Sequence, residues 1–505
     1  ELLAVQGKLR AGPFDLFFGA IYQGILYLDE SILNNPTELA LTILHELGTL
    51  QDLTHDKNLE LETEFIQTKA VQSNTLSLYS TATQIKFGTS GWRGIIGQDF
   101  TLANVRRAVE AVAEYYKQHI KQGYILIGFD PRIVNYKFAK EVASILAGNS
   151  IPVKIILEEP TPTPVLAYLA RTADDITGVI NLTASHNPFE WDGLKFLPYH
   201  GGAADERTTN LISKYANEAK TYKTISYESA KAQGLIVELS LEEVINKYVN
   251  GYIIPILKEI GAWETILTYI RNNTNFRLIL DPMQGTAVKY LEATYRALEK
   301  DSGRNFIQII NTNNKDPEFS QVNGAPNPTE KGSIKEILSL VSQGTRILGI
   351  STDGDADRFG VIDFEGKVLS ANEIIAMLSY FLVQKGLTGA VGKTVATSNF
   401  VNAIAEYLGL ELIEVAVGFK WFAEIAVNEG KQFLVAGEES AHVGVGPFMK
   451  SWDDGIAIGL LTLWMVADTN KSLTTYKQEI ENTIGKQFFY NRDDVFLSPQ
   501  LKVQT

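Results

Sequence analysis

Three aspartates alternate with other residues in the stretch "STDGDADRFG", directly after the apolar run "RILGI". These are Asp353, Asp355 and Asp357. Three carboxylates at this spacing on a loop can converge on one hard cation, and Mg2+ prefers such oxygen ligands. A calcium EF-hand loop starting at Asp353 would need glycine and glutamate where Arg358 and Phe364 stand. A solvated acidic turn would not explain the crowding beside a buried strand, so the pattern favours a magnesium site.

A serine follows another apolar run, "GVINLTA", in the stretch "TASHNPFEWDGLKF". The hydroxyl of Ser185 is a poor nucleophile unless a base, a metal or an existing covalent bond assists it. His186 is adjacent in sequence, and neighbouring side chains normally point in different directions. An Asn187-Pro188 turn with a capping serine explains the stretch equally well, so both interpretations stay open at this point.

Two further stretches contain polar groups that could bind a small polar ligand. In "GEESAH", Glu438, Ser440 and His442 could bind the hydroxyls of a polyol, although a helix start with acidic residues near its N-terminus is the alternative. In "GFKW", Lys420 offers a cation for a phosphate, but most lysines are solvated surface groups.

The composition excludes several classes of protein. The chain has 505 residues, 45% of them hydrophobic and 21% charged, which is typical of a globular protein with several domains. A net charge of −14 without a Lys/Arg block makes nucleic acid an unsuitable partner. The absence of cysteine fits a reducing, cytoplasmic location. The apolar run "GIAIGLLTLWMVA" is shorter than the ~20 residues that cross a bilayer, so no membrane partner is expected.

The elements that must position these residues alternate along the chain. From about Thr83 onward, short β-branched runs such as "YILIGFD" alternate with helical patterns such as "TLANVRRAVEAVAEYYKQHIKQG". This alternation predicts an α/β fold in three units, each with a polar loop after a strand. The Ser/Thr-rich stretch "QSNTLSLYSTATQ" joins them to a different, acidic segment with helical spacing.

Five motifs, taken in order, resemble the α-D-phosphohexomutase family of phosphoglucomutases and phosphomannomutases. They are "KFGTSGWRG", "TASHNP", "DGDADR", "GFK" and "GEESAH". The resemblance covers about residues 83–500. Secondary landmarks agree with it: "GFDPR", "PTPTP", "DPMQG", "PNPTE" and "DDGIA".

The resemblance implies three consecutive α/β domains with mixed sheets flanked by helices, around a central cleft. We expect domain I at 85–237 with a phosphoserine loop, domain II at 238–366 with a metal-binding loop, and domain III at 367–482 with a sugar-binding loop. Residues 1–75 are expected to form a separate, mostly helical extension, joined by a linker at 76–84.

The resemblance also assigns roles to single residues. Ser185 is the residue that the family holds phosphorylated, and its phosphate binds Mg2+ together with Asp353, Asp355 and Asp357. The remaining matches are as follows: Arg93 and Arg358 lie near the phosphoserine, Lys195 and His442 are candidates for proton transfer, Glu438 and Ser440 bind the sugar, and Lys420 contacts the substrate.

These roles imply a phosphohexomutase that interconverts hexose 1-phosphate and hexose 6-phosphate through a bound hexose 1,6-bisphosphate. Glu439 favours glucose, with mannose or dual specificity as the alternative. A catalytically silent sugar-phosphate-binding protein is an alternative of another class. Small sugar phosphates are the expected partners, and the sequence indicates no oligomeric state.

Two segments depart from the family pattern. Nothing after "KQFFYNRDDVFLSPQLKVQT" resembles the phosphate-gripping loop of a fourth domain, so 483–505 is expected to be its truncated start, with impaired substrate affinity and turnover. Near the N-terminus, "HELGT" has Thr49 where a zinc helix of the His-Glu-x-x-His type needs its second histidine. A metallopeptidase is therefore a distant alternative.

Overall fold

The computed structural model describes most of the chain from residue 83 onward and four short strands before it. The described residues are 9–11, 19–22, 25–28, 74–77, 83–88, 91–344 and 346–489. The "HELGT" stretch, most of the expected extension at 1–75 and residues 490–505 of the expected fourth-domain start lie outside them.

The described residues of the extension lie in short strands, and the expectation of a mostly helical segment concerns residues outside the described ranges. One small sheet has the order β1, β3, β2: β1 (Leu9–Ala11), β2 (Gly19–Tyr22) and β3 (Ile25–Leu28). Strands β2 and β3 pair antiparallel, with Tyr22 opposite Ile25. The sequences of both strands, "GAIY" and "ILYL", contain the β-branched and aromatic residues that favour strands.

The first α/β unit contains a six-stranded mixed sheet in the order β11-β7-β6-β8-β9-β5. Its strands are β5 (Trp92–Ile95), β6 (Tyr124–Phe129), β7 (Val153–Ile155), β8 (Ile176–Leu182), β9 (Trp191–Pro198) and β11 (Ile236–Glu238). Its helices are α3 (Leu102–Tyr115), continued by a π-helix at Tyr116–Ile120, α4 (Asn135–Gly148), α5 (Thr163–Thr172), α6 (Glu206–Glu218) and α7 (Tyr227–Ala232). Strand β10 (Thr221–Thr224) pairs with β4 (Asn74–Ser77), which overlaps the expected linker.

The second unit has a five-stranded sheet in the order β13-β12-β14-β15-β16. Its strands are β12 (Arg277–Asp281), β13 (Ile307–Ile309), β14 (Ile347–Thr352), β15 (Phe359–Ile362) and β16 (Val368–Leu369). Its helices are α8 (Leu241–Ile245), a π-helix at Asn246–Ile253, α9 (Ile254–Glu259), α10 (Ala262–Asn272), α11 (Val288–Ser302), a 3-10 turn at Ser320–Val322 and α12 (Lys335–Val341).

The third unit has a four-stranded sheet in the order β18-β17-β19-β20. Its strands are β17 (Ala390–Thr394), β18 (Leu412–Val415), β19 (Phe433–Gly437) and β20 (Val443–Val445). Its helices are α13 (Ala371–Gln384), α14 (Asn399–Leu408), α15 (Lys420–Asn428), a 3-10 turn at Gly446–Phe448, α16 (Gly455–Thr469) and α17 (Leu473–Ile484). A capping box between Ser370 and Glu373 starts α13.

The three units repeat one strand order, with three parallel strands followed by one antiparallel strand. The repeats are β7-β6-β8-β9, β13-β12-β14-β15 and β18-β17-β19-β20. In each repeat, a hairpin joins the third strand to the fourth, and its loop carries one of the polar motifs found in the sequence. The fold therefore presents the serine, aspartate and glutamate loops in equivalent places.

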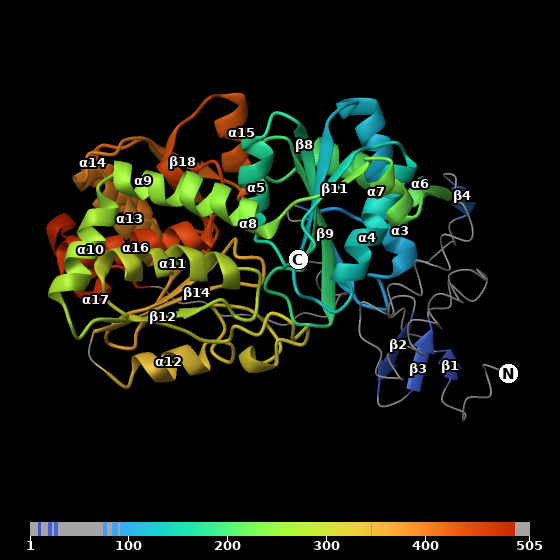
Figure 1. The fold of residues 1–505 in the computed structure, drawn as a ribbon. Coiled ribbons are helices and arrows are strands. Elements are labelled where there is room, and N and C mark those ends of the chain that lie inside the picture. The colour runs from blue at the N-terminus through green and yellow to red at the C-terminus, as the bar shows by residue number, and fades with distance from the viewer. Residues whose placement is uncertain are drawn as a thin grey trace.

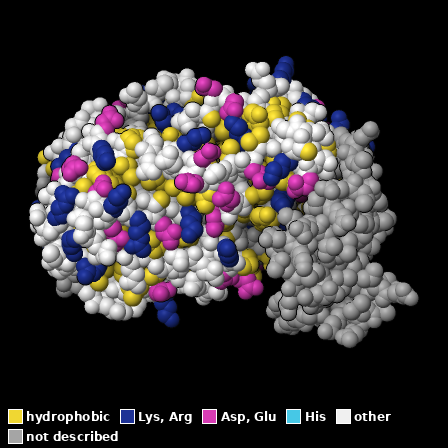
Figure 2. All heavy atoms as spheres, viewed as in Figure 1, with side chains coloured by type: hydrophobic (Ala, Val, Ile, Leu, Met, Phe, Trp, Pro, Cys, Tyr) yellow, Lys and Arg dark blue, Asp and Glu magenta, His cyan; other side chains and the backbone are white. Residues whose placement is uncertain are grey.

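Helix α16 lies at the centre of the packing between the second and third units. Its residues are buried from Gly455 to Ala467, which explains why its sequence is apolar on every side. Figure 1 shows α16 between the helices around α13 and those around α11, with the first unit beside them. Among the described residues, no helix combines the length and the apolar character that crossing a membrane requires. On the face that Figure 2 shows, acidic and basic side chains are interspersed.

Candidate active site

The serine loop begins where β8 ends. Ser185 has a φ of 56°, in the left-handed region, and is fully buried. Its backbone N donates to Thr183 Oγ1 at 2.8 Å, and its Oγ donates to Asp353 Oδ2 at 2.7 Å. Oγ also lies 3.3 Å from His186 Nδ1. The serine is thus directed at the aspartate loop.

His186 is a neutral neighbour of the serine. Burial and the guanidinium groups of Arg358 and Arg93 lower the pKa of His186 to about 2. The hydrogen bond from Ser185 Oγ to Asp353, at 2.7 Å, is shorter than its 3.3 Å contact with this ring, so the geometry favours the aspartate as the partner of the serine.

Arg132 holds the serine loop in place. Its guanidinium donates to the backbone oxygens of Ser185, Asn187, Pro188 and Trp191 at 2.7 to 2.9 Å. Asp130 accepts from Arg132 Nε at 3.0 Å, and both side chains are buried. A buried guanidinium with this many acceptors fixes the path of the loop.

The aspartate loop connects β14 to β15. One carboxylate oxygen from each of Asp353, Asp355 and Asp357 lies within 4.8 Å of the others, and all three residues are buried. Burial and the neighbouring carboxylates of Asp357 and Asp355 raise the pKa of Asp353 well above its usual value. The structure thus brings together the three side chains that the sequence predicts to converge.

The donor set fits a divalent cation. Asp355 Oδ1 and Asp357 Oδ1 are buried and have no hydrogen-bond partner. Crowded carboxylates with free oxygens are what Mg2+ binds in proteins. A metal ion at this place would be held by the three aspartates.

Lys195, from β9, neutralises part of this acidic cluster. Its Nζ lies 2.6 Å from Asp355 Oδ2 and 2.7 Å from Asp357 Oδ2. Burial alone would lower the pKa of Lys195, but the two carboxylates raise it above the usual value. The same lysine lowers the pKa of Asp357, against the effect of burial. Lys195 is therefore a cation in this arrangement.

The aspartate loop and the glutamate loop contact each other directly. Arg358 and His442 form an isolated antiparallel bridge, and Arg358 Nε donates to His442 Nε2 at 3.0 Å. On its other side, His442 Nδ1 lies 2.7 Å from Asp453 Oδ2 and 3.6 Å from Asp357 Oδ1. Burial lowers the pKa of His442, but Asp357 and the hydrogen bond to Asp453 raise it, and the net direction is upward.

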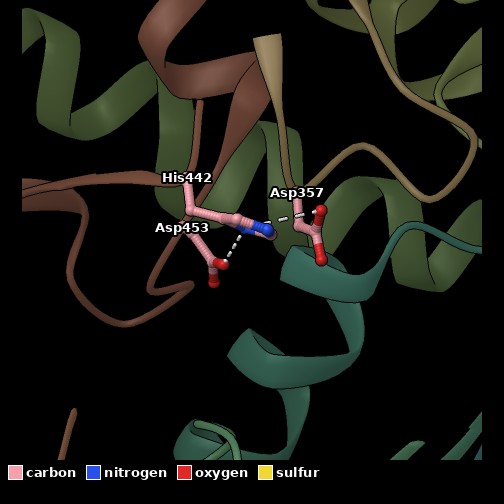
Figure 3. Close-up of side chains that lie close together, drawn as sticks. All are labelled: Asp357, His442 and Asp453. Atoms are coloured by element: carbon pink, nitrogen blue, oxygen red, sulfur yellow. Dashed lines mark hydrogen bonds and ion pairs between the residues drawn. The ribbon is translucent and has the colours of Figure 1, made fainter. Parts of the chain in front are cut away.

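Figure 3 shows the His442 ring between the carboxylates of Asp357 and Asp453. Their ligand atoms lie close enough together to hold a metal ion. The 2.7 Å separation of His442 and Asp453 is that of a hydrogen bond, so we interpret them as a hydrogen-bonded pair.

A cleft of about 290 Å³ opens beside these loops and is lined by residues of all three units. The predicted residues that line it are Lys195, Asp357, Arg358, Lys420, Glu438, Ser440 and His442. Ser440 Oγ donates to Glu438 Oε1 at 2.5 Å, and Glu438 Oε2 accepts from the backbone N of Gly418 at 3.0 Å. The cleft thus combines a glutamate and a serine that can bind hydroxyl groups with two lysines and an arginine.

The residues that line the cleft do not include Ser185, Arg93, Asp353 and Asp355. Arg93 donates to Asn187 Oδ1 at 2.8 Å, and burial lowers the pKa of its guanidinium. Because Ser185 is fully buried, a phosphoryl group on its Oγ needs the side chains around it to shift.

Three contributors to the site were not assigned a role from the sequence. Arg132, Thr163 and Asp453 stand within "GFDPR", "PTPTP" and "DDGIA". Thr163 Oγ1 donates to Asp355 Oδ2 at 2.5 Å. The motifs marked these positions, but only the fold brings them to partners that are far away in the chain.

Three family models match the chain, and all describe the phosphoglucomutase/phosphomannomutase family. They are alpha/beta/alpha domain I over residues 84–223, domain II over 257–366 and domain III over 370–483. Together these matches cover more than half of the sequence.

Individual relatives carry related names. A phosphoglucomutase from Komagataeibacter xylinus is 27% identical over 448 residues, which is 83% of this chain and 76% of the relative. A phosphoglucosamine mutase from Aliarcobacter butzleri is 28% identical over 393 residues, 76% of this chain and 80% of the relative. The open form of parafusin, a phosphoglucomutase from Paramecium, has the same fold, with a TM-score of 0.69 and 21% identity over 82% of this chain and 76% of that one.

Proposed function

The chain belongs to the phosphoglucomutase/phosphomannomutase family, and on that premise we propose that it interconverts hexose 1-phosphate and hexose 6-phosphate, with Ser185 as the phosphoryl carrier. One observation supports this most strongly. Ser185, from the first unit, donates to Asp353, from the second, beside a cleft that Glu438 and Ser440 of the third unit line. A serine at an acidic cation site next to hydroxyl-binding groups suits the transfer of a phosphoryl group to and from a sugar.

The proposed reaction has two phosphoryl transfers of opposite direction. In the first, the bond from phosphorus to Ser185 Oγ breaks and a bond forms from phosphorus to O6 of hexose 1-phosphate, whose hydroxyl proton passes to a base on the cleft wall. The hexose 1,6-bisphosphate then turns over within the cleft. In the second transfer, the 1-phosphoryl group returns to Ser185 Oγ, and O1 of the released hexose 6-phosphate regains a proton.

Lys195 and His442 are the two proton-transfer candidates, and their surroundings suit them to opposite tasks. The carboxylates around Lys195 keep its ammonium protonated, so it suits the donation of a proton and the binding of developing negative charge. His442 accepts a hydrogen bond at Nε2, so that nitrogen has a lone pair that can take a proton.

Mg2+ would be held by Asp353, Asp355 and Asp357 together with the phosphate on Ser185. It would neutralise charge on the transferring phosphoryl group. Arg358 and Arg93 lie close enough to the aspartates to affect pKa values there, and they would hold the remaining phosphoryl oxygens.

Glucose is our preferred sugar, and mannose or dual specificity is the alternative. Glu439 lies beside the sugar-binding pair and accepts from Thr394 Oγ1 at 3.2 Å. The relatives are named for both glucose and glucosamine phosphates, so the test includes all three sugars. The cytoplasmic location stays a prediction from the cysteine-free composition.

Mass spectrometry of the intact protein, with mapping of the modified site, tests the proposal. The protein is charged with glucose 1,6-bisphosphate and Mg2+ and then incubated with the 1-phosphates of glucose, mannose and glucosamine. We expect a phosphate on Ser185 that is lost fastest with glucose 1-phosphate, and no phosphate or turnover in Ser185→Ala. If the protein binds sugar phosphates but Ser185 never becomes phosphorylated, the result would instead indicate a catalytically silent binding protein.

A further inference from the structure

Asp453 contacts His442 on the side of the ring away from Arg358. The Asp453 carboxylate lies 2.7 Å from His442 Nδ1, and its side chain is 18% exposed at the cleft (Figure 3). Neither the sequence motifs nor the proposed reaction gives Asp453 a task. A short hydrogen bond to the ring of a proton-transfer candidate is therefore a contact that needs an explanation.

The hydrogen bonds of His442 determine where its proton resides. Arg358 Nε is a donor only, so the Nε2 atom that it contacts must provide a lone pair. The remaining ring nitrogen, Nδ1, then carries the hydrogen, and Asp453 accepts it. The two contacts together describe a ring with its hydrogen on Nδ1, because a nitrogen that carried a hydrogen could not accept from Arg358.

Asp453 is held rigidly in the fold. The next residue, Asp454, is the N-cap of α16 and accepts from the backbone N of Ile456 and Ala457. Tyr248 Oη also donates to Asp454 Oδ2, at 2.6 Å. The carboxylate of Asp453 is thus presented to His442 by the anchored start of a buried helix.

We propose that Asp453 is a positioning residue that holds His442 with its hydrogen on Nδ1, so that Nε2 is the nitrogen that exchanges protons with the sugar hydroxyl. The inference rests on the proposed function of His442 as a proton-transfer residue. In the structure Nε2 is covered by Arg358. A phosphoryl group on Ser185 or on the sugar would attract that guanidinium and uncover Nε2.

The first test reads the position of the hydrogen directly. The protein has six histidines, so selective 15N labelling of histidine gives few ring signals. The His442→Gln variant identifies the signals of His442. Their nitrogen chemical shifts in mildly alkaline solution give the tautomer. We expect the Nδ1–H form in the parent protein and a shift towards Nε2–H in Asp453→Asn, whose amide can donate to Nδ1. An Nε2–H ring in the parent would overturn the inference.

The second test separates positioning from binding. Asp453→Asn preserves the shape of the side chain, so we expect an unchanged melting temperature and KM, and a kcat reduced on the order of 10- to 100-fold. Asp453→Glu should restore part of the loss. Asp174→Asn, at an exposed site, is the matched control. An unchanged kcat, or a raised KM that would indicate direct contact with the sugar, would refute the assignment.

The two tests also keep this inference apart from the proposed function. If the parent protein transfers no phosphoryl group with any of the three sugars, the proposed function fails, and the tautomer measurement still decides whether Asp453 orients His442. If the parent is active and Asp453→Asn is equally active, only the inference about Asp453 fails.

Discussion

At the scale of single residues, Asp281 at the end of β12 predicts a pH-dependent stability. It is fully buried in the "DPMQG" loop, and burial raises its pKa to about 7, although the backbone N of Met283 and the side chain of Asn311 donate to it. The folded pKa exceeds the unfolded value, so the stabilising contribution is complete below the unfolded pKa and is lost as pH rises through the folded one.

Replacing Asp281 with Asn should remove this dependence. A shift of roughly three pKa units corresponds to at most about 4 kcal/mol, so the melting temperature of Asp281→Asn relative to the parent should rise between the usual pKa of 3.8 and the folded pKa of about 7, and level off above it. Thermal denaturation across this range measures the difference. Asp174→Asn, at an exposed position, should show a constant difference. A constant difference for Asp281→Asn too would mean that Asp281 is ionised throughout.

Single residues also show what the sequence could and could not predict. The three aspartates were predictable because they lie within five positions, and their convergence is a local property of one loop. Arg132 was not, because its acceptors lie more than fifty residues away and are backbone oxygens that any sequence provides. Asp453 lies in a motif that the sequence shows, but its hydrogen bond with His442 depends on how α16 packs against the aspartate loop.

At the scale of elements, glycines let the loops approach each other closely. A Cβ on Gly354 would lie 2.5 Å from the backbone oxygen of Ser185, and one on Gly285 would lie 2.6 Å from the backbone oxygen of Gly354. The "DPMQG" loop, the aspartate loop and the serine loop are therefore stacked through backbone contacts that leave no room for a methyl group.

Gly354→Ala should consequently displace the serine from the aspartates. Overpacking of this kind typically costs about 1–3 kcal/mol, and a misplacement near 1 Å can slow a transfer on the order of 100-fold. We expect the Gly354→Ala protein to remain folded. Its phosphorylation at Ser185 by glucose 1,6-bisphosphate, measured by mass spectrometry, should be slower than in the parent. Gly251→Ala is the control, since its Cβ meets only Asn246 O at 3.7 Å. Equal phosphorylation rates in the two variants would contradict the stacking argument.

The elements themselves were predictable as types but not in their pairing. Alternating β-branched and helical stretches predicted strands such as β6, β8 and β14, because burial on both faces favours runs of mostly apolar residues. The return hairpins from β8, β14 and β19 were not predictable, since periodicity does not distinguish parallel from antiparallel partners. The π-helix after α3 also continues a helical pattern without a distinct signal.

At the scale of the whole molecule, polar contacts across the aspartate loop join the first unit to the second. Ser185, Thr163 and Lys195 of the first unit all bond to carboxylates of the second. Three crowded carboxylates repel each other, and one ammonium offsets only part of that repulsion. The contact between the units should therefore depend on the cation that the aspartates hold.

Mg2+ should accordingly stabilise the protein, and more so when Ser185 carries a phosphate. A ligand at one hundred times its dissociation constant stabilises the folded state by about 2.7 kcal/mol, and a phosphate adds oxygen ligands from the first unit to those of the second. We expect Mg2+ to raise the melting temperature of the phosphorylated protein by several degrees, that of Ser185→Ala by less, and that of Asp355→Asn least, with reversal by a chelator. Equal increments in all three proteins would place the stabilising ion elsewhere. The phosphorylated protein and Ser185→Ala should differ in the rise of melting temperature that Mg2+ causes. This difference measures how strongly the phosphate and the cation together join the two units, because contacts within either unit are the same in both proteins.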